Sequence, residues 1–174
     1  MVLPDVLEPG LKVVFCGSAV GSVSARRGAY YAHPGNRFWR VLHLVGLTPR
    51  QLRPEEYATL PEYGIGLTDV VKGASGRDID ISHGEMASSR GRLALQAKIE
   101  RFRPRALAFN GKKAAQVFLD TPYVSYGRQP ERLGPSEIFV LPSTSGAARR
   151  YWDLTHWVEL ADFVGRWLAS SSGV

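Results

Sequence analysis

The chain has 174 residues, 44% hydrophobic and 22% charged, with 22 Lys and Arg against 16 Asp and Glu. This length and composition are typical of one globular domain that buries its core without disulfides or metals, and they exclude a largely disordered chain. The formal net charge of +6 makes nucleic acid the first partner to test, although it fits a merely basic protein equally well.

The single cysteine, Cys16, lies in an apolar run, which excludes an internal disulfide framework and a cysteine-based zinc or iron–sulfur site. Residues 1–9 lack the pattern of a signal peptide, and no apolar run reaches membrane-spanning length. We therefore expect a cytoplasmic, bacterial-type, nucleoid-associated monomer with no membrane partner. The expected organisation is one domain over residues 1–169 and a flexible tail at 170–174.

The first predicted element is a buried strand over residues 11–16, because that run is apolar, β-branched and aromatic and ends at Gly17. A long polar loop follows. Asn36 is then a natural N-cap for a helix in which Phe38 and Leu42 stand at helical spacing.

A short helix is expected to open at Pro54, and residues 66–71 predict a second strand that runs into a polar loop at 72–81. Ser82 and Glu85 have the spacing of a capping box and predict the start of another helix. The apolar side of that helix is expected to carry Leu93, Ile99 and Phe102.

The remaining pattern predicts a third strand at 105–111, a helix at 112–119 and a fourth strand at 137–141. Residues 153–168 have the pattern of a packed surface helix, which makes its tryptophan a core residue rather than a ligand platform. Its expected apolar face comprises Leu154, Trp157, Val158, Ala161, Val164 and Leu168.

This order predicts an α/β fold: a three-layer, doubly wound, mostly parallel central sheet of about four or five strands with helices on both faces. Ligands of such sheets bind beyond the carboxyl ends of the strands. The loops expected to carry function are therefore 17–35, 72–81, 110–112 and 142–150.

The glycine-containing loop 17–21 would let backbone N–H groups approach an anion or a base edge. Alone it is a weak signal, because any doubly wound protein can have a glycine turn there. A nucleotide-phosphate enzyme is a minor alternative, since the full phosphate-loop and dinucleotide patterns are missing.

A more specific signal follows at residues 30–39, YYAHPGNRFW, which combine stacking rings, an imidazole and a cationic helix start. With VVFCG at 13–17, GLTDVV at 66–71, NGK at 110–112 and LPSTSG at 141–146, this string resembles the mismatch-specific uracil and thymine DNA glycosylases of the uracil-DNA glycosylase superfamily. The likeness spans nearly the whole chain.

The resemblance implies an enzyme that flips a uracil, with thymine and etheno-cytosine as alternative substrates, out of its pair with guanine and hydrolyses the N-glycosidic bond with water. It implies that the Tyr31 ring stacks on the flipped base. The alternative is that Tyr31 is an ordinary half-buried tyrosine without a binding role. His33 is a candidate donor to the departing base, although a structural histidine is equally compatible. The implied base pocket comprises Gly17, Ser18, Ala19, Gly21, Tyr31, His33 and Asn110.

Residues 143–150 match the family's insertion loop, which enters the DNA stack. Here the chain departs from the family, because Ala147 and Ala148 stand where a larger wedge side chain is usual. The plug must be small or come from Arg149, for which a phosphate contact is the more common role. The implied DNA-binding residues are Ser24, Asn36, Arg37, Lys112, Ser145, Gly146, Ala147, Ala148 and Arg149.

A second departure concerns catalysis, because Ala19 replaces the asparagine that often positions the attacking water in this family. Asp78, ahead of Asp80, is the candidate to orient water and stabilise positive charge on the sugar, and two solvated loop acids are equally compatible. No lysine in the matched loops occupies a family nucleophile position, so the expected enzyme is monofunctional, with no metal and no cofactor. The alternative is a catalytically weak or silent binder of mismatched or abasic DNA.

Overall fold

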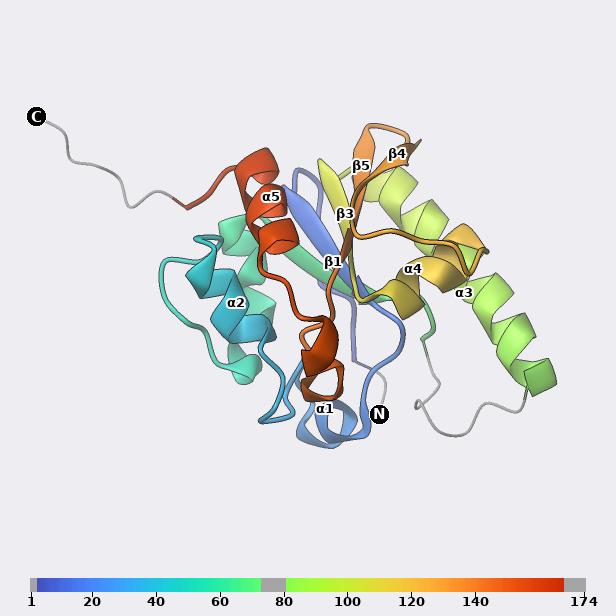
Figure 1. Cartoon of the computed structure of the whole chain (residues 1–174), viewed down its shortest axis with the longest axis horizontal. Coiled ribbons are helices and arrows are strands. Elements are labelled where there is room, and N and C mark those ends of the chain that lie inside the picture. Colours follow the sequence, from blue (N-terminus) through green and yellow to red (C-terminus); the bar gives the residue numbers. More distant parts are fainter. Residues whose placement is uncertain (1–2, 73–80, 168–174) are drawn as a thin grey trace, which may run out of the picture.

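The computed structural model describes residues 3–72 and 81–167, and of residues 81–87 it describes the backbone alone. Strands and helices alternate along most of the chain (Figure 1). The strands are β1 (Val13–Gly17), β2 (Ile65–Asp69), β3 (Ala106–Asn110), β4 (Gly127–Leu133) and β5 (Ser136–Leu141). The helices are α1 (Ser22–Arg27), α2 (Phe38–Leu44), α3 (Ile81–Phe102), α4 (Lys112–Leu119) and α5 (Thr155–Val164), with 3-10 helices η1 (Pro54–Tyr63) and η2 (Gly146–Tyr151).

The five-stranded sheet has the order β2-β1-β3-β5-β4. β1 pairs in parallel with β2 and β3, β3 pairs in parallel with β5, and β4 is antiparallel to β5. The carboxyl ends of four strands therefore meet at one edge of the sheet. The winding direction changes at β1, and ligands of open α/β sheets bind at such a switch point.

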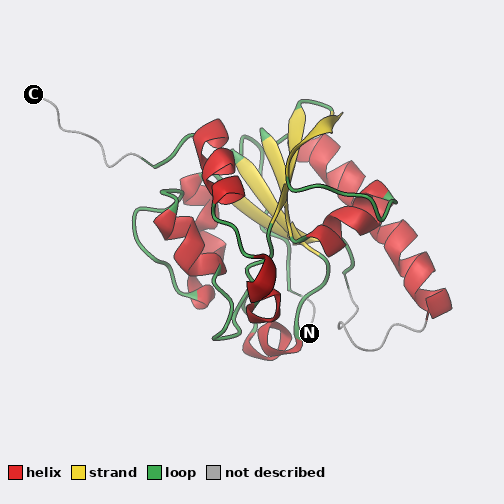
Figure 2. Cartoon of the chain, in the orientation of Figure 1, coloured by secondary structure: helices red, strands yellow, loops and turns green. Residues whose placement is uncertain are grey.

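Helices cover both faces of the sheet (Figure 2). Successive side chains of a strand point to opposite faces, so alternate residues pack against different helices. Val13 and Phe15 belong to the core cluster with residues of α2, η1 and α5, whereas Val14 and Cys16 belong to the cluster with residues of α3 and α4. Trp157 of α5 stacks on Phe15, with ring centroids 5.5 Å apart, and is fully buried. The two apolar layers hold the strand ends in fixed positions.

The predicted fold class is confirmed: the sheet is mostly parallel and carries helices on both faces. Three elements were not expected, and one of them is η2, which begins inside the predicted loop 142–150. α1 lies inside the predicted polar loop, and β4 forms the antiparallel edge of the sheet. The sequence of β4, GRQPERL, is charged and contains a proline, which a strand tolerates at an edge.

Several predicted boundaries were wrong in detail. The strand predicted at 66–71 ends at Asp69, and the N–H groups of Val70 and Val71 instead donate to the carbonyls of residues 17 and 18. The cap of α2 is Arg37, although the Asn36 side chain still accepts a hydrogen bond from the N–H of residue 38. Leu93 is 66% exposed, so its predicted place on the apolar side of α3 was wrong.

The ends of two helices also differ from prediction. α3 begins at Ile81, so Ser82 lies inside the helix rather than at its cap, and α5 spans ten residues, fewer than the predicted 153–168. Within the ranges described, no helix is both long and apolar enough to span a membrane.

Candidate active site

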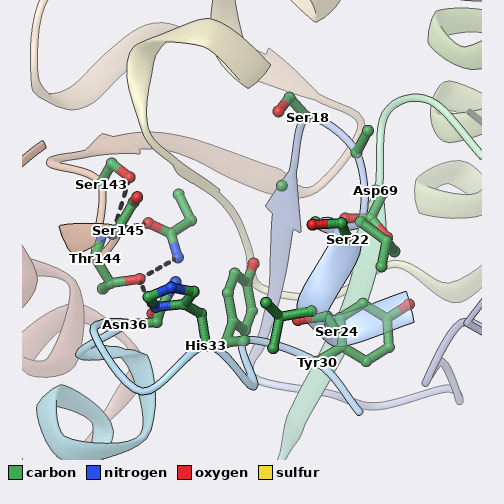
Figure 3. Close-up of a pocket in the computed structure, with 17 residues that line it drawn as sticks. Ser18, Ser22, Ser24, Tyr30, His33, Asn36, Asp69, Ser143, Thr144 and Ser145 are labelled. Atoms are coloured by element: carbon green, nitrogen blue, oxygen red, sulfur yellow. Dashed lines mark hydrogen bonds between the residues drawn. The ribbon is translucent and has the colours of Figure 1, made fainter. Parts of the chain in front are cut away.

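A cavity of about 370 Å³ opens at the carboxyl ends of β1, β2, β3 and β5. It receives side chains from the loop after β1, from α1 and from the segment before α2 (Figure 3). Its lining comprises Gly17, Ser18, Ala19, Val20, Gly21, Ser22, Val23, Ser24, Tyr30, Tyr31, His33, Asn36, Asp69, Asn110, Ser143, Thr144 and Ser145.

Tyr31 presents an aromatic ring inside this cavity. Its ring packs on that of Phe38 with centroids 4.1 Å apart, and its backbone has φ +52°, in the left-handed region that non-glycine residues rarely adopt. The hydroxyl is enclosed and has no hydrogen-bond partner in the described structure. Burial, with the nearby charge of Asp69, raises the pKa of this phenol well above its usual value. Local strain of this kind clusters at functional sites.

A hydrogen-bond network joins three segments along one wall. The hydroxyl of Thr144 accepts from Asn110 Nδ2 at 2.9 Å and donates to Asn36 Oδ1 at 2.7 Å, and its backbone N–H donates to Asn110 Oδ1 at 3.0 Å. The ends of β3 and β5 are thereby fixed relative to the start of α2. Both hydrogen bonds to the Asn36 side chain are accepted by Oδ1, so its side-chain amide nitrogen is left to donate to a ligand.

Asp69 forms the opposite side of the cavity (Figure 3) and was not singled out by the sequence analysis. It ends β2 and is only 4% exposed. Its Oδ2 accepts a hydrogen bond from Lys72 Nζ at 3.0 Å. The sequence carried only a partial signal: Asp69 is an acidic residue in the second half of a predicted parallel strand, near the edge where functional side chains gather.

The residues predicted for the base pocket all line the cavity: Gly17, Ser18, Ala19, Gly21, Tyr31, His33 and Asn110. Their individual roles stay predictions. His33 is exposed, and its Nδ1 accepts from the N–H of Gly35 at 2.9 Å. Its Nε2 is therefore the nitrogen left to donate to a ligand.

The predicted DNA-binding residues divide into two groups. Ser24, Asn36 and Ser145 line the cavity, and the buried Ser24 hydroxyl accepts from the N–H of Ala32 at 3.0 Å, which holds the wall together. The second group lies outside the cavity lining and comprises Arg37, Lys112, Gly146, Ala147, Ala148 and Arg149.

The predicted insertion loop folds as η2. Ser145 begins it, with its hydroxyl accepting from the N–H of Ala147 at 3.3 Å, and Gly146 packs closely on Gly35, where an added side chain would lie 3.1 Å from a carbonyl oxygen. The loop is therefore anchored beside the segment that carries His33.

Basic side chains surround this loop. The Arg37 guanidinium lies 4.2 Å from the centroid of the Trp152 ring. Burial and the charges of Arg149 and Arg40 lower the pKa of Arg37. Lys112 stands over the Tyr126 ring at 4.4 Å. Arginine and lysine side chains of this kind bind the phosphate groups of nucleic acids.

Asp78 and Asp80, the predicted catalytic acids, lie outside the residues that the structure describes. Among the side chains that the structure describes, those of residues 3–72 and 88–167, no three from His, Cys, Asp or Glu gather as a metal site would require.

The comparisons with known proteins agree with this geometry. Residues 4–162 match the family model described as the uracil DNA glycosylase superfamily. The chain is also similar to the solution NMR structure of "a putative Uracil DNA glycosylase" from Methanosarcina acetivorans, with 26% sequence identity and a TM-score of 0.57 over 94% of this chain and 95% of that one. The protein therefore belongs to the uracil DNA glycosylase superfamily, and membership implies a hydrolytic glycosylase that acts on DNA.

Proposed function

We propose that the protein excises uracil from its pair with guanine in duplex DNA and leaves an abasic site. The observation that carries this proposal is the cavity at the switch point of the sheet, with the Tyr31 ring inside it. Its volume of about 370 Å³ falls within the range of small-ligand pockets. The similar solved structure bears the name of a uracil DNA glycosylase, which supports the same base.

Base flipping is required because the sugar carbon that reacts is hidden inside the base stack. Stacking of the extruded base on an aromatic ring is worth about 1–3 kcal/mol and offsets part of the unstacking cost. Tyr31 is held for this role by its contact with Phe38. The flipped base would reach Asn110 and the backbone of Ser18 along the cavity wall.

Water, rather than an amine of the protein, is the proposed nucleophile. No lysine is among the described residues that line the cavity, so a covalent route through an imine has no candidate there. Ala19 cannot hold the water through its side chain. Our prediction that Asp78 does so, ahead of Asp80, rests on the sequence alone, and a positioned carboxylate would contribute about 10²- to 10⁴-fold to the rate.

In this proposal η2 enters the DNA stack and selects a base that is paired with guanine. Ala147 and Ala148 are small, so the plug is proposed to come from Arg149, one of the two arginines of η2. Arg37, which follows the cavity-lining Asn36, and Lys112, at the start of α4, are the proposed contacts to the flanking phosphates.

A second candidate function is a weak or silent binder of mismatched or abasic DNA, and Ala19 is the observation that favours it. One assay separates the two: single-turnover release of base from duplexes carrying G:U, G:T and A:U pairs, with alkali to cleave abasic sites. We expect release from G:U to be fastest. Specific binding without release would select the silent binder, and equal rates for G:U and A:U would overturn the mismatch preference.

A further inference from the structure

Two polar atoms converge beside Gly17 inside the cavity. A methyl group added to Gly17 would lie 3.0 Å from Asp69 Oδ1 and 3.4 Å from the Tyr31 hydroxyl. Asp69 Oδ1 makes no hydrogen bond within the described residues, whereas Oδ2 is engaged by Lys72. The oxygen left over belongs to a residue that lines the cavity, so it is available to a bound base.

Lys72 holds this carboxylate in place through an ammonium group that contacts four partners. Its ammonium contacts Asp69 Oδ2 at 3.0 Å, the Tyr30 hydroxyl at 2.8 Å, Asp5 Oδ1 at 2.9 Å and the carbonyl of Leu3 at 3.1 Å. The four partners come from the N-terminal segment, the residue next to the stacking ring and the end of β2. One side chain therefore ties the position of Asp69 to the rest of the cavity.

The same contacts bear on the charge of Asp69. Burial raises the pKa of Asp69, and the positive charge of Lys72 opposes that rise. Burial also works to lower the pKa of Lys72, but the charge of Asp69 and the hydrogen bonds to Tyr30 and Asp5 raise it above its usual value. The 3.0 Å contact between Lys72 Nζ and Asp69 Oδ2 has the geometry of an ion pair, in which Lys72 offsets the negative charge that the carboxylate would otherwise bring to a departing base.

We infer that Lys72 is a positioning residue that holds Asp69 through Oδ2, so that the cavity presents Oδ1 as an acceptor and selects bases that offer an N–H donor. This inference rests on the proposed function and names its substrate class. Uracil and thymine carry an N–H on the edge opposite the sugar. Etheno-cytosine does not, because its ethene bridge occupies the ring nitrogen and the exocyclic nitrogen of that edge. The site therefore favours uracil and thymine over etheno-cytosine.

The first test measures the ratio of single-turnover rates for uracil and etheno-cytosine, each opposite guanine, in the intact protein and in Asp69→Asn. In the variant, the amide oxygen would face Lys72 and the amide N–H would face the cavity, which replaces the acceptor by a donor. We expect the ratio to exceed tenfold in the parent and to fall by about 10- to 150-fold in the variant, the factor that loss of a charged hydrogen bond costs. A parental ratio near one, or an unchanged ratio in the variant, would overturn the inference.

The second test reads the pH profile of uracil release. Removing the charge in Lys72→Met takes away the influence that lowers the pKa of Asp69, so the loss of activity on the acid side should move to higher pH. Lys72→Arg should keep the parental profile, and Asp69→Asn should lack this limb. Charged or titratable groups that face Asp69 are Lys72, Asp5, Lys98, Tyr30, Tyr31 and Cys16. An acid limb at the same pH in Lys72→Met and the parent would contradict a positioning role for Lys72.

The tests stay informative if the protein releases no base. Affinities for duplexes that carry non-hydrolysable 2′-fluoro-arabino uracil or etheno-cytosine give the same ratio without chemistry. Absence of release together with a preference for the uracil duplex would refute the proposed activity and support the inference. Release of both bases at equal rates would support the proposed activity and refute the inference. Thermal unfolding of each variant checks folding, and Asp69→Asn carries the test if Lys72→Met does not fold.

Discussion

Removal of the Tyr31 ring should weaken binding of an extruded base. Stacking on an aromatic ring contributes about 1–3 kcal/mol, which corresponds to about 5- to 150-fold in affinity. Tyr31→Ala should lower affinity for a G:U duplex analogue by that factor, whereas affinity for a fully paired duplex should change little. Tyr31→Phe keeps the ring and removes a hydroxyl that is enclosed without a partner, so it should bind as the parent does.

A glycine variant separates stacking from folding. Tyr31 has φ +52°, a conformation that costs alanine of order 1 kcal/mol and glycine almost nothing. Tyr31→Gly should therefore be more stable than Tyr31→Ala in denaturant unfolding, and both should lose the same amount of affinity in fluorescence titrations. Parental affinity in Tyr31→Gly would refute stacking as the role of the ring.

Three further predictions concern the DNA surface, the catalytic water and metal dependence. Arg149→Ala should weaken duplex binding and reduce the slope of log affinity against log salt by about one if the side chain contacts a phosphate; a larger loss on mismatched than on matched duplex would identify a plug, and no loss would reject both roles. Asp78→Asn should slow single-turnover release by about 10²- to 10⁴-fold with little effect on affinity, and Asp80→Asn should slow it much less. Parental rates in both variants would refute the carboxylate hypothesis, and Ala19→Asn would then be the next variant to test. Base release should survive excess chelator, because protein hydrogen bonds can stabilise the leaving base; activity lost in chelator and restored by added metal would refute this.

The strands that determine the fold could be predicted, although not their exact ends, because they are short apolar runs. Buried strands of a parallel sheet look like this in any α/β protein. β4 could not be predicted in the same way, since an edge strand is free to carry charges and Pro130. α1 was missed because its sequence, SVSARR, has no apolar period of its own and lies next to a glycine.

The glycine loop and the YYAHPGNRFW string were enough to predict most of the residues that line the cavity, because these residues lie close together in the sequence. Asp69 was missed for a different reason. It was assigned to the interior of a strand at 66–71, and only the early end of β2 reveals that its side chain lines the cavity. Lys72 lies outside every motif, and its role depends on contacts with Asp5 and Tyr30, which are distant in sequence.

The bond between Thr144 and Asn36 joins residues that are 108 positions apart. At a synthesis rate of about 5–20 residues per second, the ribosome needs roughly 5–20 s to make the intervening chain. Tyr31 is thus translated well before the wall formed by Thr144. A nascent chain with Tyr31 exposed still lacks the enclosed cavity, so base recognition is acquired late in synthesis, when the end of β5 docks on α2.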